Sequence, residues 1–586
     1  MAYLLPVLAY QGLTRHFLNL LLLVPVVAVI CFFRKRTWLA LLFSLSVSTL
    51  CLLHEVSNRT LSDILSLLTI EQIVVVNQIK SSFFSSLWAR DILYFIDIPI
   101  WLCWLRYPPA GKVGKNIVAA SFLLGLAAQG VFWMSLSVAD KERLFFRHKN
   151  IGLMLAGGVV EYHLIDLREF LEEFLEHSRS KPIPREWVEQ NLTELKKSWS
   201  DGPYKGRWKG KNLWFVQLES LQWFALDAQV DGQPVMPFLH DLANRSLRFD
   251  RCYDQTATGV SLDCDFMVNN SLVPNVGRPT FYRYRDTDFY SLTHVLNDLG
   301  YLTICTHDEN PAFYNLPVIT LKFGYKVRRF VGETPPPPKP DELIGPLGMR
   351  DYSLLYRVLK GLEPLKVPFL AHIVCPMGHA PYQELRPDQR LLRLPPRLQG
   401  TMMGDYLQTC RFRDEELKHF FQEYLASPLA KNTAICVYGD HTSHMSRQET
   451  SRFFGRTLSP LEQAEQQRIL IFFYDGQSQG RIEKPCGLID FAPTIAYLLG
   501  ETSLTPVWLG RNVFSTEPHL TVCRRHGFVA TEDGLKELSE SHEGLPPLSP
   551  SQKEEVQRQI LFSERLCLQN QIRKFANWSP ARPSRN

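Results

Sequence analysis

The sequence predicts an N-terminal bundle of transmembrane α-helices followed by an α/β domain with a mostly parallel central sheet. Residues 1–138 are dominated by Leu, Val, Ile and Phe, whereas the remainder has the charge density of a soluble protein. From residue 213 onward, short apolar runs typical of buried strands alternate with segments of helical spacing, which indicates a parallel sheet with helices on both faces. The net charge of +5 over 586 residues is small and does not indicate a nucleic-acid partner.

Four apolar stretches of the first part have nearly the length of about 20 residues that a membrane-spanning helix needs. They are residues 17–33, 38–53, 91–105 and 117–138. A fifth stretch, residues 61–79, carries Asp63 and Glu71, so it is either another span or a helix in the membrane interface. Basic loops at residues 34–36 and 106–115 mark the cytoplasmic side. The last span then runs outward, and the rest of the chain is expected in the periplasm or at the cell exterior.

Three further segments follow this anchor. Residues 139–204 are a charged juxtamembrane connector, in which residues 162–175 are expected to form an amphipathic helix. The α/β domain is expected over residues 205–535, and the polar residues 536–586 are expected to leave its core as a tail. The predicted strands are residues 213–218, 247–253, 301–305, 368–374, 434–438 and 469–474, and the predicted helices include residues 291–299, 349–362, 405–426 and 488–499.

Candidate metal ligands follow two of these strands directly. Glu219 comes after the strand 213–218, and Asp440 and His441 come after the strand 434–438. Because the carboxyl ends of parallel strands meet at one edge of an open α/β sheet, we expect the three side chains to converge. Carboxylate oxygens and imidazole nitrogens are common ligands of divalent metals. The sequence therefore predicts a metal site at this edge.

A nucleophile for attack on phosphorus is predicted within residues 256–266, which follow the strand 247–253 and open a helix. Amides at a helix N-terminus stabilise the anion of a hydroxyl placed there, and a bound metal lowers the pKa of that hydroxyl. Ser261 is the first candidate and Thr258 is the second. His379, in a Gly-His-Ala-Pro turn after a later strand, is a candidate either to hold a substrate phosphate or to protonate the leaving group.

In their order and spacing, four segments resemble the lipoteichoic acid synthase family of the sulfatase and alkaline phosphatase superfamily: residues 217–222, 256–266, 378–379 and 438–441. The resemblance covers residues 205–515 and extends to the multi-span anchor. It implies a sulfatase-like catalytic domain that transfers phosphoglycerol from phosphatidylglycerol to an extracytoplasmic glycan or polymer. It also implies a covalent Ser or Thr intermediate and a divalent metal, typically Mn²⁺, with Zn²⁺ and Mg²⁺ as alternatives.

Carried over residue by residue, the resemblance makes Glu219, Asp440, His441 and the oxygen of Ser261 the metal ligands. Ser261 stands where the family has its nucleophilic threonine, and a serine is chemically suited to the same role. The implied partners are a membrane phospholipid donor and a glycan or glycolipid acceptor. The implied substrate-binding residues are His307, Asp308, Asn315, His379 and His444.

One departure from the family concerns the donor headgroup. Asn315 is followed by Leu316, whereas the family has an arginine that is expected to grip the headgroup phosphate. Arg411, His444 and residues 403–406 are nearby candidates to replace it.

Three other functions stay open. The spacing Thr258-x-x-Ser261-x-x-Cys264 is similar to the nucleophile region of phosphoethanolamine transferases and would make Thr258 the nucleophile. A metal-dependent phosphodiesterase or sulfatase-type hydrolase is a second alternative, although residues 261–265 lack the sulfatase signature. An inactive membrane scaffold is the third, and the retained metal ligands argue against it.

The cysteines do not form an obvious disulfide framework. The sequence has twelve of them, and nine follow the anchor, so at least one stays free or pairs between chains. Cys252 and Cys264 are the first pair to test for a disulfide.

Overall fold

The computed structural model describes scattered positions between residues 38 and 171, then residues 182–197 and 202–576 with gaps at 258, 277–279, 309–315, 331–336, 345–347, 381, 444, 502–506 and 539–544. The chain forms two compact units, Met1–Ser180 and Lys181–Asn586. Each unit is described by itself below.

The first unit contains the predicted membrane anchor. Its described helix α4 (Ile98–Arg106) overlaps the predicted span 91–105. Within the described positions, no helix combines the length and the apolar character of a membrane span. The predicted span 17–33, the apolar stretch 61–79 and most of the predicted amphipathic helix 162–175 lie outside the described residues. The number of spans therefore stays a prediction.

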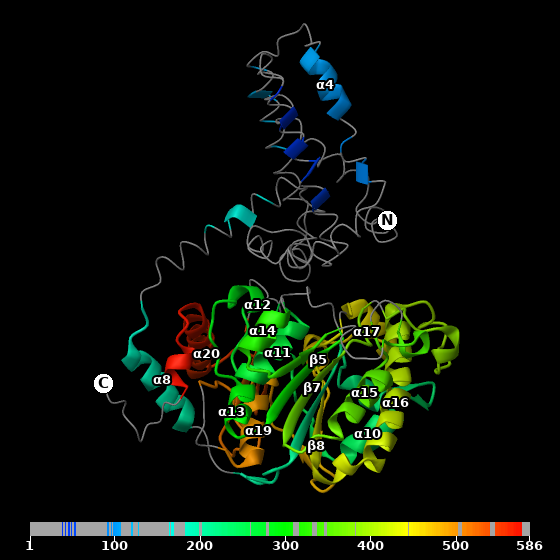
Figure 1. The fold of residues 1–586 in the computed structure, drawn as a ribbon, viewed down its shortest axis with the longest axis vertical. Coiled ribbons are helices and arrows are strands. Elements are labelled where there is room, and N and C mark those ends of the chain that lie inside the picture. The colour runs from blue at the N-terminus through cyan, green and yellow to red at the C-terminus, as the bar shows by residue number, and fades with distance from the viewer. Residues whose placement is uncertain are drawn as a thin grey trace. The chain divides into compact units, whose positions relative to one another are not determined.

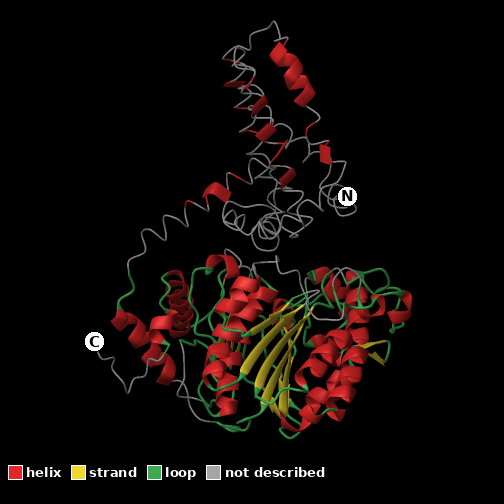
Figure 2. Ribbon diagram, in the orientation of Figure 1, coloured by secondary structure: helices red, strands yellow, loops and turns green. Residues whose placement is uncertain are grey.

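The second unit is built around an eight-stranded sheet, drawn in yellow in Figure 2. The strand order is β10-β4-β9-β8-β1-β7-β5-β6, and only β9 runs antiparallel to its neighbours. This confirms the prediction of a mostly parallel sheet. The strands are β1 (Asn212–Leu218), β4 (Leu247–Phe249), β5 (Leu302–His307), β6 (Val327–Arg329), β7 (Phe369–Cys375), β8 (Thr433–Gly439), β9 (Ile471–Tyr474) and β10 (Gly480–Ile482).

Helices cover both faces of this sheet, so its central strands are buried along almost their whole length (Figure 1). In β1, Leu213 and Phe215 point into one core, and Trp214 and Val216 point into the other. The first core is closed by α8 (Arg185–Lys197), α11 (Ser261–Asn270), α12 (Thr280–Arg283), α13 (Leu292–Asp298), α14 (Leu316–Lys322), α19 (Phe491–Leu499) and α20 (Pro550–Leu568). The second core is closed by α9 (Phe224–Asp227), α10 (Pro237–Asn244), α15 (Asp351–Leu362) and α16 (Met402–Ala426).

Several smaller elements were not predicted from the sequence. A three-stranded antiparallel sheet consists of β11 (Leu520–Cys523), β12 (Phe528–Thr531) and β13 (Gly534–Glu537). A short hairpin pairs β2 (Gln229–Val230) with β3 (Gln233–Pro234), and two short helices, α17 (Arg447–Phe454) and α18 (Pro460–Glu465), follow β8. These elements are too short to give a clear periodic signal in the sequence.

Two sequence predictions for this unit need correction. The strand expected over 247–253 ends early: β4 stops at Phe249, and Cys252 and Tyr253 pair only through isolated bridges. The segment 536–586 was expected to leave the core, but Phe562 and Leu566 of α20 are buried in the first core. These two side chains lie four residues apart, on one face of an otherwise polar helix, which is sufficient for packing.

Candidate active site and metal centre

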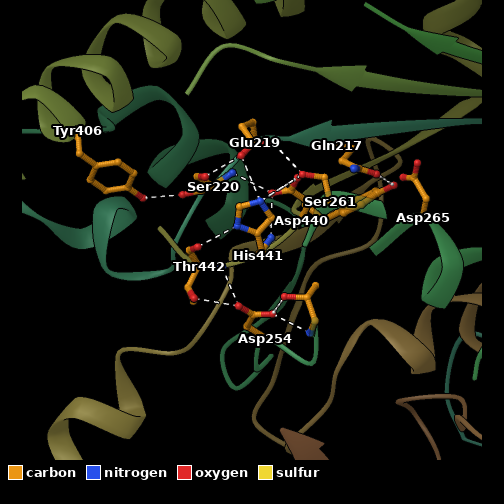
Figure 3. Close-up of polar contacts among 12 residues, drawn as sticks. Gln217, Glu219, Ser220, Asp254, Ser261, Asp265, Tyr406, Asp440, His441 and Thr442 are labelled. Atoms are coloured by element: carbon orange, nitrogen blue, oxygen red, sulfur yellow. Dashed lines mark hydrogen bonds and ion pairs between the residues drawn. The ribbon is translucent and has the colours of Figure 1, made fainter. Parts of the chain in front are cut away.

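Two neighbouring strands bring the predicted metal ligands together. β1 and β8 are parallel with Leu218 opposite Gly439, so Glu219 and Asp440 follow at the same edge of the sheet. Glu219, Asp440 and His441 are buried, and each offers a ligand atom within 4.8 Å of the other two. Figure 3 shows the three side chains converging on one point.

Ser261 joins this group from the start of α11. Its Oγ donates a hydrogen bond to Oε2 of Glu219 at 3.0 Å and lies 3.2 Å from Nε2 of His441. The preceding residue, Val260, has a φ of 49°, which is rare for a β-branched side chain. Such a conformation persists only where the surrounding structure enforces it. The strained turn places the Ser261 hydroxyl against the metal ligands, as the sequence predicted for the nucleophile.

The chemistry of these side chains fits a divalent cation. Oδ2 of Asp440 is buried and has no hydrogen-bond partner among the described residues. Nδ1 of His441 donates to the backbone oxygen of Thr442 at 2.8 Å, which turns Nε2 toward Ser261 and Glu219, where a metal would bind. Two carboxylates, an imidazole and a hydroxyl suit Mn²⁺, Zn²⁺ and Mg²⁺ to different degrees.

The pKa shifts of the three ligands reflect concentrated negative charge. Burial and the neighbouring Glu219 carboxylate raise the pKa of Asp440 to about 8. Burial alone would lower the pKa of His441, but Asp440 and Glu219 raise it to about 10. Burial alone would raise the pKa of Glu219, but His441, with a smaller contribution from His379, holds it well below its usual range. A positive charge between these side chains would therefore offset the repulsion between the Glu219 and Asp440 carboxylates.

Hydrogen bonds that involve residues other than the metal ligands hold the chain after β1 in place. Ser220, which has a φ of 57°, donates its backbone N–H to Oδ1 of Asp440 at 2.8 Å. The hydroxyl of Tyr406 donates to the backbone oxygen of Ser220 at 3.0 Å. Groups of this kind orient metal ligands and are often as sensitive to mutation as the ligands themselves.

Arg413 on α16 supports the site and was not singled out in the sequence. It is almost fully buried; Nη1 donates to the backbone oxygen of Glu219 and Nε donates to Oδ2 of Asp351, both at 2.8 Å. The sequence analysis named Arg411 instead, which pairs with two acidic residues one turn further along its own helix. The run Arg-Phe-Arg-Asp does not indicate which of its arginines points inward.

His379 follows β7, and its side chain is exposed. The preceding Gly378 has a φ of 111°, and a Cβ there would come within 2.8 Å of the backbone oxygen of Glu219. This close approach holds the His379 turn against the metal-ligand strand. The position fits the predicted contact with a substrate that arrives from solvent.

Two predicted substrate-binding residues are already engaged by protein groups. Nε2 of His307 lies 3.1 Å from Oδ2 of Asp265 on α11, and both side chains are buried. The carboxylate of Asp308, also buried, accepts a hydrogen bond from the backbone N–H of Met349. Both residues are therefore buried beside α11 and the adjacent loop, and their contact with a substrate stays a prediction. Three other predicted residues lie outside the described residues: Thr258, Asn315 and His444.

Comparisons with known proteins agree with this geometry. Residues 211–501 match the Sulfatase family model, and residues 8–174 match the lipoteichoic acid synthase N-terminal domain. Lipoteichoic acid synthase 1 of Bacillus subtilis is 27% identical over 486 residues, 81% of this chain and 75% of that protein. The lipoteichoic acid synthase of Staphylococcus saprophyticus is 25% identical over 549 residues, 90% of this chain and 83% of that protein. The crystal structure of the lipoteichoic acid synthase LtaP from Listeria monocytogenes gives a TM-score of 0.57 at 23% identity, covering 66% of this chain and 98% of that one.

The fold and the metal-ligand set at its sheet edge thus define a protein of the sulfatase and alkaline phosphatase superfamily. Proteins of this superfamily depend on metal ions, which is consistent with the candidate metal site. Within it, the chain belongs to the lipoteichoic acid synthase-like proteins, because both family models and the relatives of similar length agree. The resemblance noted in the sequence motifs is confirmed.

Proposed function

We propose that this protein is a metal-dependent phosphoglycerol transferase that uses phosphatidylglycerol as donor. The acceptor is a glycan or polymer outside the cytoplasmic membrane. The observation that carries the proposal is the Ser261 hydroxyl, hydrogen-bonded to Glu219 and adjacent to His441 at the start of a helix. The names of its lipoteichoic acid synthase relatives support the donor and acceptor classes.

In the first half-reaction, Oγ of Ser261 attacks the donor phosphorus. A bond forms between Ser261 and phosphorus, the bond from phosphorus to the diacylglycerol oxygen breaks, and diacylglycerol leaves with a proton. His379, exposed beside Glu219, is positioned to supply that proton. The Ser261 proton goes to solvent, so the net exchange is one proton from serine for one on diacylglycerol.

In the second half-reaction, a hydroxyl of the acceptor attacks the same phosphorus. His379 accepts the proton of that hydroxyl, and Ser261 leaves and regains a proton. Ser261 is the first residue of α11, so the positive end of the helix dipole favours the negative charge that develops on its oxygen in both steps. The two steps together move phosphoglycerol without releasing it to water.

Four residues are the proposed ligands of the implied cation. Glu219, Asp440, His441 and the Ser261 oxygen would bind it, and we propose Mn²⁺ as the metal. When bound, it would lower the pKa of the attacking hydroxyl and neutralise charge that develops in the transfer.

The proposed function also implies a membrane topology for the three segments of the chain. Residues 1–138 anchor the protein in the membrane with four or five spans, residues 139–204 connect, and the catalytic domain lies outside. The match of residues 8–174 to the lipoteichoic acid synthase N-terminal domain supports the anchor. Digestion of residues 205–586 by protease added to intact spheroplasts would support this topology, and protection in intact but not in lysed spheroplasts would contradict it.

The test is diacylglycerol release by the full-length protein in detergent with Mn²⁺ and phosphatidylglycerol. We expect Ser261→Ala to abolish release and Thr258→Ala to retain it. Without acceptor, release should stop near one diacylglycerol per protein, whereas continued turnover into water would indicate a hydrolase. Loss of activity in Thr258→Ala with Ser261→Ala active, or use of phosphatidylethanolamine alone, would favour phosphoethanolamine transfer.

A further inference from the structure

Two cysteines face each other on neighbouring segments beside the nucleophile loop. Cys252 and Cys486 form an isolated parallel bridge. The backbone N–H of Tyr253 donates to the oxygen of Cys486 at 2.9 Å, and the N–H of Cys486 donates to the oxygen of Arg251 at 3.0 Å. Neighbouring strands lie about 4.8 Å apart, which falls within the Cα separation of about 4.4–6.8 Å that a disulfide spans.

The two thiols also meet in space. Both side chains belong to the same buried core, with exposures of 0% for Cys252 and 2% for Cys486. Burial, and then a hydrogen bond with the Cys486 thiol, raise the pKa of the Cys252 thiol well above its usual range. The geometry of the backbone and the contact of the side chains therefore agree on one pair.

The structure thus changes the partner that the sequence suggested for Cys252. Cys264 lies on α11, where burial and then the carboxylates of Asp440 and Asp265 raise the pKa of its thiol. Cys523 at the end of β11 is close enough to contribute to the pKa shift of Cys252, so it is the competing partner.

We propose that Cys252 and Cys486 form a disulfide in the mature protein. This inference rests on the proposed position of the domain outside the cytoplasmic membrane, where disulfides persist. Each thiol loses one hydrogen and the two sulfurs join. The two electrons and two protons pass to a disulfide-bearing oxidant, which becomes a dithiol.

The disulfide would fix the start of the loop that leads to Ser261. Cys252 stands two residues before Asp254, whose carboxylate holds Thr256 at the start of that loop. On the other side, Cys486 precedes Ile489, whose backbone N–H donates to the side chain of Gln255 at 3.2 Å. The disulfide would join these two segments, which are far apart in sequence, and restrict the unfolded chain over the long loop between them.

The test begins with the full-length protein, expressed with its own anchor and quenched directly from cells. The cells are quenched in acid, which stops thiol–disulfide exchange, and are then dissolved in neutral denaturant with excess alkylating reagent, so that free thiols are labelled at once. Non-reducing proteolysis and mass spectrometry then identify linked peptides. We expect a peptide containing Cys252 joined to one containing Cys486, with the mass of the two reduced peptides less two hydrogen atoms.

A stability measurement provides the second readout. Addition of reductant should lower the unfolding midpoint of the wild-type protein by on the order of 5–10 °C. The double variant Cys252→Ala and Cys486→Ala should show no response to reductant. The matched control Cys436→Ala removes an equally buried thiol of the same core from β8 and should keep the full response.

Complete alkylation of both cysteines in the quenched cells, or a link from either one to Cys523 or Cys264, would overturn the proposal. The result is independent of catalysis, because the linked peptide is read by mass alone. A protein that carries the bond but releases no diacylglycerol would overturn the proposed function and leave the disulfide standing. An active protein in which both thiols are free would overturn the disulfide and leave the proposed function standing.

Discussion

Asp254 accepts hydrogen bonds from the backbone N–H and from the hydroxyl of Thr442, at 2.9 and 2.8 Å. Thr442 directly follows the metal-ligand candidate His441. The same carboxylate accepts from the backbone N–H and the hydroxyl of Thr256, at 2.8 and 2.6 Å, in the loop that leads to Ser261. One buried side chain therefore holds the metal-ligand loop and the nucleophile loop together (Figure 3).

This relationship predicts that Asp254→Asn weakens metal binding although Asp254 is not a ligand. The amide cannot accept all four of these hydrogen bonds and the contact with Nε2 of His526 at 3.0 Å, so the loop after β8 loses its anchor. We expect Mn²⁺ affinity or transfer activity to fall about 10- to 100-fold, measured by calorimetry and by diacylglycerol release. Asp475→Asn is the control, because Asp475 is buried at the opposite edge of the sheet, where it binds Trp208. Equal losses of Mn²⁺ affinity in the two variants would contradict this role.

Asp263 is expected to make folding stability depend on pH. Its carboxylate accepts from the backbone N–H groups of Ala257 and Gly259, both at 2.9 Å, and burial raises its pKa to about 6. The folded state therefore holds this proton more tightly than the unfolded chain, whose Asp pKa is about 3.9. The resulting stabilisation is complete below about pH 4 and is lost as the pH rises through about 6.

The measurement compares the wild-type protein with Asp263→Asn by urea denaturation from pH 4 to pH 7. Relative to the variant, the wild-type free energy of unfolding should fall by on the order of 2 kcal/mol across this range. A difference that is constant with pH would show that folding leaves the pKa of Asp263 unchanged, and a wild-type advantage that grows toward neutral pH would show that folding lowers this pKa; either result contradicts the prediction.

Arg413 and Arg411 should respond differently to the same substitution. Arg413→Met leaves the buried carboxylate of Asp351 unpaired and releases the backbone oxygen of Glu219. We expect a loss of about 3–5 kcal/mol in the free energy of unfolding, together with weaker Mn²⁺ binding. Arg411→Met removes one pair with the partly exposed Glu415 and one with the buried Asp414, whose carboxylate still accepts from the N–H groups of Phe238 and Leu239, so its loss should be the smaller of the two. A larger loss from Arg411→Met, measured by chemical denaturation, would count against the assignment.

Asp440→Asn should separate metal binding from folding. In chelator the variant should be about as stable as the wild type, because the raised pKa of Asp440 already keeps its carboxyl largely neutral at pH 7 and the amide oxygen can still accept from the backbone N–H of Ser220. Mn²⁺ at about a hundred times its Kd should stabilise the wild type by about 3 kcal/mol, and should not stabilise the variant. Thermal unfolding with chelator and with Mn²⁺ gives both values. A variant stabilised by Mn²⁺ as much as the wild type would exclude Asp440 as a ligand.

Features that depend on neighbouring sequence could be predicted, since a strand packed on both faces is mostly apolar and a charged residue marks its end, although β1 also buries the polar Gln217. Glu219, Asp440 and His441 were found in this way, and the structure brings them together. Ser261 followed from the helix that begins after a polar loop.

Features that depend on packing between distant segments could not be predicted. Arg413 lies in a long helix whose pattern does not reveal its inward side, and Asp254 gains its importance only because Thr442 folds against it. The same holds for α20, whose few apolar residues find a core built from earlier parts of the chain. His307 was assigned by resemblance alone, and its burial against Asp265 was not visible in the motif.

The central claim is that Ser261 carries the transferred group. The most direct measurement is the mass of the full-length protein, acid-quenched after incubation with Mn²⁺ and phosphatidylglycerol in the absence of acceptor, followed by peptide mapping. We predict one glycerol phosphate per chain, located on Ser261 and absent from Ser261→Ala and from chelator-treated protein. An adduct located on Thr258, or release of diacylglycerol with no adduct on the protein at any quench time, would contradict the claim.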